Sequence, residues 1–147
     1  MGDHAMAQHQ KVTQDWILSL MKNMEDQFQP DLRIRLMESC GRDCARRSSI
    51  YPTKTEGNDP VTFANTLKRY IGKENVTIED GMIRLQYDTC FCPLVSKGPD
   101  SLPESYCHCS VGWLKEMFEK ASGEPVGVEL IQSIKRGAPS CQFIIRW

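Results

Sequence analysis

The sequence lacks most features that mark nucleic-acid-binding, membrane-spanning and secreted proteins. Its 147 residues carry a formal net charge of −1, so binding to nucleic acid has no electrostatic support. No apolar run approaches the roughly 20 residues that cross a bilayer. The first ten residues, MGDHAMAQHQ, have no charged-then-apolar secretory pattern, and Met6 stands where a myristoylation signal needs serine or threonine. We therefore expect a cytoplasmic protein with no membrane span and no nucleic-acid partner.

Several catalytic and architectural signatures are also missing. The sequence has no glycine-rich phosphate-binding loop, no serine nucleophile elbow, no internal repeat and no low-complexity tract. Hydrophobic residues make up 40% and charged residues 25%, which is typical of globular domains. A chain of this length suits a single domain, residues 1–147, with one core. We expect residues 1–9 to form a disordered tail.

Hydrophobic periodicity and turn residues predict an α+β fold. Asp59 followed by Pro60 is a helix-start signal, and Asp80-Gly81 between two alternating runs is a hairpin signal. The predicted helices are residues 10–28, 31–47, 60–72 and 105–122, and the predicted strands are 75–79, 82–87, 125–134 and 141–147. This order, α-α-α-β-β-α-β-β, predicts helices packed on one antiparallel sheet of about four strands.

Seven cysteines are the feature that most needs explaining, and their odd number argues against a disulfide framework. Two Cys-x-Cys pairs, Cys90 with Cys92 and Cys107 with Cys109, flank a loop at residues 93–104 that can fold back and bring them together. A pair two residues apart shares a metal only where the backbone bends. The second pair lies at a helix start, where the dipole favours thiolate. The alternative is that these cysteines are small buried hydrophobes.

Two other groups of residues have both a functional and a structural interpretation. Cys40 and Cys44 share a face of the second predicted helix, near Arg42 and Arg46. The functional interpretation is a second pair of metal ligands or an anion-binding patch. The alternative is that Cys44 packs in the core and the arginines are solvated. His108 is a candidate ligand or base, or else an exposed side chain.

The end of the chain carries a recognisable pattern. Residues 109–145 read CSVGWLKEMFEKASGEPVGVELIQSIKRGAPSCQFII, with a cysteine before a long helix and a closing Gly137-x-x-x-Cys141-x-Phe143. Residues 105–147 resemble the C-terminal half of the 4-vinyl reductase-like domain family. They also resemble the related L-2-amino-thiazoline-4-carboxylate hydrolase-like proteins. The resemblance implies an α+β module that binds small molecules, found alone or in sensory regions of transcription factors for aromatic compounds.

The resemblance also implies a structural zinc site. Cys109, Glu129 and Cys141 have counterparts among the family's ligands, although Glu129 is about one position out of register. The fourth ligand does not have a counterpart, because Ser133 stands at its position. A zinc site at this place, or an iron–sulfur cluster as the alternative, then needs additional thiolate ligands from elsewhere in the chain. The candidate metal ligands are Cys90, Cys92, Cys107, Cys109, Cys141 and Glu129.

Three functions follow as hypotheses. The first is a small-molecule-binding or sensory domain with a thiolate metal site and an apolar pocket between helices and sheet. Its candidate ligand-binding residues are Arg42, Arg46, Phe63, Tyr87, Trp113 and Met117. The second is a hydrolase of a cyclic amide or thiazoline, with Cys107 or Cys109 as nucleophile and His108 or Glu104 as proton carrier. The third is a dimeric adaptor that pairs through the amphipathic first helix, which carries Trp16.

Overall fold

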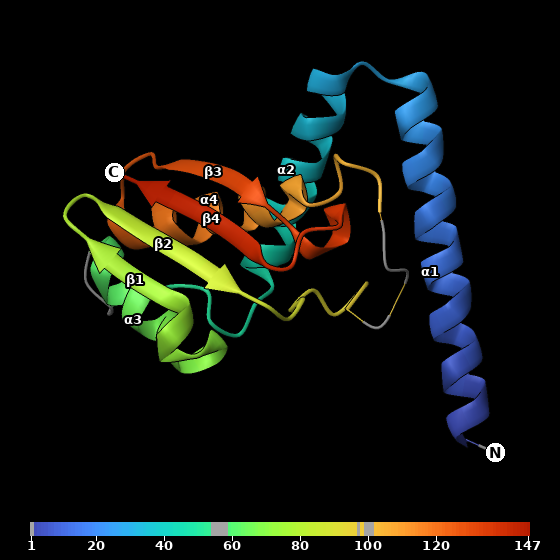
Figure 1. Ribbon diagram of the computed structural model, residues 1–147, viewed down its shortest axis with the longest axis horizontal. Helices are drawn as coiled ribbons and strands as arrows, with labels where there is room; N and C mark the ends of the chain where they lie inside the picture. The colour runs from blue at the N-terminus through green and yellow to red at the C-terminus, as the bar shows by residue number, and fades with distance from the viewer. Residues whose placement is uncertain (1, 54–58, 97, 99–101) are drawn as a thin grey trace.

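Four helices and one four-stranded sheet make up the fold (Figure 1). The computed structural model describes residues 2–53, 59–96, 98 and 102–147. The helices are α1 (Gly2–Gln27), α2 (Pro30–Arg46), α3 (Pro60–Ile71) and α4 (His108–Ser122), with short 3-10 turns η1 (Lys73–Asn75) and η2 (Ile134–Arg136). The strands are β1 (Val76–Glu79), β2 (Met82–Tyr87), β3 (Gly127–Gln132) and β4 (Cys141–Arg146). The predicted fold class and element order are therefore confirmed.

Local sequence signals explain the boundaries of the central elements. The Asp59 carboxylate accepts a hydrogen bond from the Val61 backbone N–H at 3.0 Å, and Pro60 occupies the first turn of α3. Gly81 has a φ of 66°, as the tight β1–β2 turn requires. The largest difference from the predicted boundaries is at the N-terminus: α1 begins at Gly2, so residues 2–9 are helical instead of a disordered tail. The predicted loop at 93–104 lies partly outside the described residues.

The sheet is antiparallel throughout, in the order β1-β2-β4-β3. Its helix-covered face presents alternate residues such as Ile83, Leu85, Phe143 and Ile145, which are all buried. The opposite face carries the intervening side chains of the same strands and, among the described elements, has no helix packed on it (Figure 1). Only one side of the sheet therefore contributes to the main core.

The main core lies between the sheet and helices α3 and α4. Phe63 of α3 packs edge-on against Phe118 of α4 with ring centroids 5.0 Å apart. Met117 and Phe118 are fully buried. Apolar burial on this scale is the main term that stabilises a domain of this size.

Helix α2 lies against α4 at a close crossing made by two glycines. A Cβ atom placed on Gly41 would lie 1.8 Å from the Cys109 carbonyl oxygen, and one on Gly112 would lie 1.9 Å from the Glu38 carbonyl oxygen. The missing side chains therefore let the two backbones touch. The crossing positions the start of α4, and with it Cys107 and Cys109, against α2.

Ionic contacts reinforce the same pair of helices. Arg42 donates to Glu116 at 3.1 Å and to Glu119 at 2.7 Å, while Arg46 donates to Glu116 at 2.9 Å. Tyr51 donates to the same Glu116 carboxylate at 2.8 Å. Burial alone would raise the pKa of Glu116, but the donors Arg46, Tyr51 and Arg42 outweigh it and hold that pKa below its usual value.

Helix α1 stands to one side of the body and joins it at the turn into α2 (Figure 1). Val95 and Leu102, from the stretch between β2 and α4, pack in one apolar cluster with Met21 and Met24 of α1. No helix in the described part of the chain is both long enough and apolar enough to cross a membrane.

Candidate functional site

A second apolar cluster, separate from the main core, lies under α1 and is rich in sulfur. Its buried members are Met21 and Met24 of α1, Met37 of α2, and Val95, Leu102 and Tyr106 of the segment before α4. Cys90, Cys92, Cys107 and Cys109 pack against it in half-buried positions. We call these ten residues the sulfur-rich cluster. The predicted convergence of the two Cys-x-Cys pairs is thus observed, while buried Cys141 belongs to the adjacent main core.

Three of the thiols make hydrogen bonds, each to a different kind of partner. The buried Ser133 hydroxyl donates to Cys107 Sγ at 3.2 Å. The Ile134 backbone N–H donates to Cys141 Sγ at 3.4 Å. Cys92 Sγ lies 3.7 Å from the Tyr106 hydroxyl, which is the one polar atom of an otherwise apolar buried ring.

Burial controls the ionisation of these groups. It raises the pKa of the Cys109 thiol to about 12, and it raises the pKa values of Cys107 and Cys141 as well. Burial also raises the pKa values of the Tyr87 and Tyr106 phenols. The sequence predicted that the helix start would favour thiolate at Cys107 and Cys109. At both thiols burial acts in the opposite direction, because it disfavours the charged form.

The candidate metal ligands do not share one place. Glu129 lies opposite Ile144 on the uncovered face of the sheet and forms an ion pair with Arg146 at 3.1 Å, whereas Cys141 lies on the helix-covered face. Ser133 donates a hydrogen bond to Cys107. Within the described ranges, no three cysteine, histidine or carboxylate side chains are arranged to hold a metal ion. The geometry does not fit a closed four-ligand site, and metal binding stays a prediction without structural support.

The candidate catalytic groups lack the arrangement that an activated thiol requires. His108 is half-buried, and burial lowers its pKa. Its Nδ1 is enclosed and has no hydrogen-bond partner in the described part of the protein. The hydrogen bonds given above join the thiols to hydroxyl and backbone groups rather than to a histidine or carboxylate base. A cysteine nucleophile therefore stays a prediction.

The candidate ligand-binding residues fall into three different environments. Arg42 and Arg46 are engaged by the carboxylates of α4, as described above. Phe63 and Met117 fill the space between helices and sheet where an apolar pocket was expected. Tyr87 is half-buried at the edge of the same core, with its ring 5.0 Å from Phe91 and 6.3 Å from Phe143. Trp113 is half-buried on α4.

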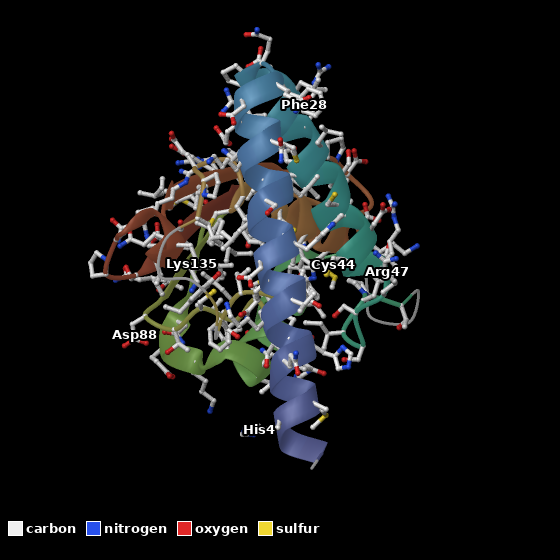
Figure 2. All side chains as sticks on the ribbon, turned by 90° about the vertical axis from the view of Figure 1, so that its right-hand side faces the viewer. His4, Phe28, Cys44, Arg47, Asp88 and Lys135 are labelled. Atoms are coloured by element: carbon white, nitrogen blue, oxygen red, sulfur yellow. The ribbon has the colours of Figure 1, made fainter. Side chains whose placement is uncertain are left out.

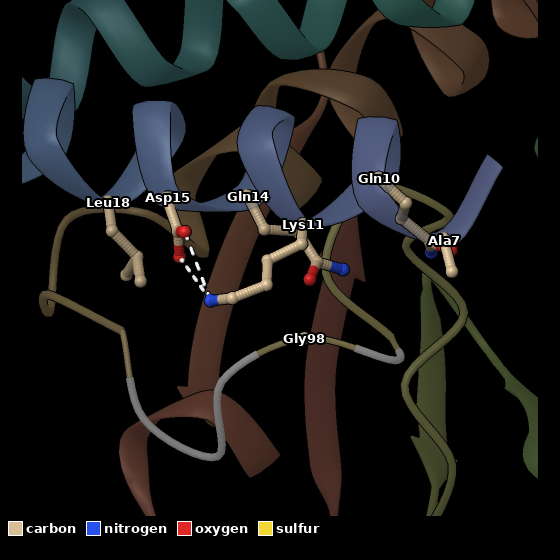
Figure 3. A pocket seen from close by; sticks show the side chains of 7 residues that line it. All are labelled: Ala7, Gln10, Lys11, Gln14, Asp15, Leu18 and Gly98. Carbon is tan, nitrogen blue, oxygen red and sulfur yellow. Dashed lines mark hydrogen bonds and ion pairs between the residues drawn. The ribbon is translucent and has the colours of Figure 1, made fainter. Parts of the chain in front are cut away.

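Two of the hollows on the described surface are lined mostly by residues with polar side chains. The first lies beside α1 and is lined by Ala7, Gln10, Lys11, Gln14, Asp15, Leu18 and Gly98 (Figure 3). Lys11 and Asp15 form an ion pair there at 3.1 Å. The second lies at the end of β1 and β2 and is lined by Glu74, Asn75, Thr77, Arg84, Gln86, Tyr87, Asp88 and Ser140. Neither hollow offers the apolar walls of a typical small-molecule pocket.

Comparison with known proteins assigns the whole chain to one family. A family model described as a family of unknown function, DUF6144, matches residues 1–146. The chain belongs to the DUF6144 family. No curated protein matches the sequence at a significant level.

A solved structure shares the fold of this DUF6144 chain. It is the crystal structure of the phenol-responsive sensory domain of the transcription activator PoxR with phenol. The TM-score is 0.54 at 13% sequence identity, over 88% of this chain and 72% of that chain. At this identity the likeness shows the fold alone.

Sequence reasoning about this DUF6144 chain missed part of the cluster. Met21, Met24, Met37 and Tyr106 were not among the candidate site residues. The available signal was the methionine content of the first two helices beside a cysteine-rich segment. Ser133 was noted only as a missing metal ligand, and its hydrogen bond to Cys107 could not be read from the sequence.

Proposed function

We propose that this DUF6144 domain binds a small aromatic molecule in the sulfur-rich cluster, and that binding there serves a sensory role. The observation that supports this most directly is the fold shared with the phenol-responsive sensory domain of PoxR. Within that fold, the sulfur-rich cluster is an apolar region separate from the main core, and it contains few polar atoms. Binding sites for small molecules combine apolar walls with a few convergent polar groups.

The side chains of the cluster suit an aromatic ligand. Thioether and thiol sulfurs are polarizable and make favourable contacts with ring edges, and unbranched methionine side chains fill irregular gaps. Met21, Met24 and Met37 can therefore repack around a ring that enters between α1 and α2. The Tyr106 hydroxyl, paired only weakly with Cys92 at 3.7 Å, offers a hydrogen bond to a ligand hydroxyl.

Methionine NMR tests both the binding and its place. The chain has seven methionines, three of which lie in the sulfur-rich cluster, whereas Met117 lies in the main core and Met82 on β2. With ¹³C-methyl-labelled methionine, titration with phenol should shift the Met21, Met24 and Met37 signals and leave those of Met117 and Met82 in place. Shifts confined to Met117 would move the site to the main core, and no shift at millimolar phenol would overturn the proposal.

A matched pair of tyrosine variants tests the polar contact. Tyr106→Phe should weaken phenol binding by about fivefold, because one hydrogen bond contributes about 1 kcal/mol. Tyr70→Phe removes a hydroxyl from an exposed tyrosine of α3 and should bind phenol as the parent chain does. Equal affinity of both variants would contradict the assigned role of Tyr106.

A further inference from the structure

The exposed apolar side chains of the chain are concentrated on its first two helices. Twelve large apolar residues are exposed in the described structure, and seven of them lie between residues 6 and 36. These seven are Met6, Val12, Trp16, Leu20, Phe28, Leu32 and Leu36. An apolar surface of this extent is a common sign of a protein–protein contact.

On α1 these residues form one stripe. Val12, Trp16, Leu20 and Met24 follow one another at four-residue spacing, which places them along one side of a helix. Their exposed fractions are 62%, 64%, 43% and 8%, so the stripe is covered by α2 only at Met24. The stripe lies opposite the side of α1 that carries Gln14 and Leu18. Figure 2 views α1 from outside the molecule, and no other segment of the ribbon crosses in front of it.

The exposed stripe has an extension on α2. Leu32 and Leu36 are four residues apart and exposed, and Phe28 lies at the turn between the two helices. They follow directly on Met24, where the α1 stripe becomes buried. Exposed apolar side chains therefore continue along the sequence from α1 through the turn into α2.

Charged residues beside the stripe alternate in sign. Lys11, Asp15, Lys22 and Asp26 occupy one flank of α1 at spacings of four, seven and four residues, and all four are exposed. When the series is read from its C-terminal end, each position carries the charge opposite to that of the series read from its N-terminal end. A second α1 in antiparallel orientation then brings Lys11 opposite the partner's Asp26, and Asp15 opposite the partner's Lys22. A parallel two-fold arrangement would instead set this flank against the partner's other flank, so the charged series would not face itself.

The register that pairs these charges is centred between Leu18 and Ser19. Within one residue of that register, Trp16 lies beside the partner's Leu20, and Val12 lies near the C-terminal end of the partner's stripe. We propose that the chain forms a two-fold symmetric dimer in which the two α1 helices pack antiparallel along Val12, Trp16 and Leu20. The 26-residue length of α1 and the continuation of the apolar surface to Leu36 suit the roughly 800 Å² per partner of a stable interface.

The first experiment measures oligomeric state. Sedimentation equilibrium of the parent chain at micromolar concentration should give a dimer. Trp16→Glu should raise the dissociation constant about 100-fold, since a central tryptophan is a typical interface hot spot. Trp147→Glu changes the other exposed tryptophan and should stay dimeric. A monomeric parent chain, or a Trp16→Glu variant that dimerises like the parent, overturns the proposal.

The second experiment tests orientation and does not depend on a variant that folds poorly. Isotopically light and heavy chains are mixed and treated with a carbodiimide, which joins lysine to carboxylate without a spacer. Mixed-mass cross-links should join Lys11 to Asp26 and Lys22 to Asp15. The Lys11–Asp15 cross-link should form within single chains, because their side chains already lie 3.1 Å apart. Mixed-mass links that join other pairs instead overturn the antiparallel register.

Discussion

Burial, rather than position on a helix, controls the thiol chemistry at the start of α4. Cys109 occupies the first turn of α4, where an exposed thiol has a lowered pKa, yet its pKa is raised to about 12. The free energy of desolvating a thiolate therefore exceeds the stabilisation from the helix dipole at this site. The same reasoning applies to Cys107 and Cys141.

The raised pKa of Cys109 predicts how stability depends on pH. The thiol has an ordinary pKa of 9.0, so below pH 9 it is neutral in both states and its contribution to stability is fully present. Above pH 9 only the unfolded chain ionises, and stability is lost as the pH rises toward 12. Urea unfolding should show this alkaline fall in the parent chain and a shallower fall in Cys109→Ala. Cys40→Ala removes an exposed thiol and should keep the parent slope; identical slopes for all three proteins would contradict the assignment.

Single residues also show where prediction from sequence succeeds and fails. Asp59, Pro60 and Gly81 act on their own neighbours, so their roles as helix cap, helix start and turn were predicted correctly. The contact of Ser133 with Cys107 joins residues 26 positions apart and depends on the packing of the whole chain. Glu129 was misplaced for a related reason, since a family pattern gives the order of ligands but not the face of the sheet.

Among the elements, alternation of apolar and polar residues gave the strands to within about two residues. The alternation is local, and the buried face of the sheet enforces it. The length of α1 was not predicted, because residues 2–9 lack an apolar stripe and the pattern favoured a disordered tail. The crossing of α2 and α4 was also missed. It requires Gly41 and Gly112 to meet, and no local pattern in either helix indicates that they do.

At the α2–α4 crossing, we expect the steric cost of a side chain at position 41 to exceed the stability gained from helix propensity. Alanine at position 41 gains about 1 kcal/mol of helix propensity over glycine. Its Cβ would lie 1.8 Å from the Cys109 carbonyl oxygen, so the backbones must separate and the packing of α2 on α4 is lost. Gly41→Ala should therefore lower the free energy of unfolding by about 3 kcal/mol in urea titrations. Gly127→Ala, with its nearest atom at 3.9 Å, should lower it by less than about 1 kcal/mol; a Gly41→Ala chain as stable as the parent would refute the crossing.

At the scale of the whole molecule, two apolar clusters differ in how much structure holds them. The main core is enclosed by the sheet, α3 and α4, whereas the sulfur-rich cluster depends on α1 and one connecting segment. Fewer buried contacts mean a smaller free energy of local opening. The region proposed to bind ligand is thus also the region expected to open first.

Native-state hydrogen exchange tests this order of opening. Amides in residues 10–27 of α1 should exchange with a free energy at least about 2 kcal/mol below that of β2 and β4. The measurement belongs in Trp16→Glu, where self-association of α1 does not protect the helix. Saturating phenol should reduce the difference in exchange free energy between α1 and the two strands, because a ligand that binds only the closed form stabilises that form. Equal protection of α1 and the central strands would show one cooperative unit instead.

Helix α1 joins the rest of the molecule at one end, so a rotation about that end moves the other end of the helix. A helix of 26 residues is about 39 Å long, so a tilt of about 10° around Phe28 moves its far tip by about 7 Å. Met21 and Met24 lie close to that pivot, so in the proposed binding mode a ring that enters beside them would act on this angle. A small rearrangement of the sulfur-containing side chains near Phe28 would then produce a larger displacement of the N-terminal end of α1.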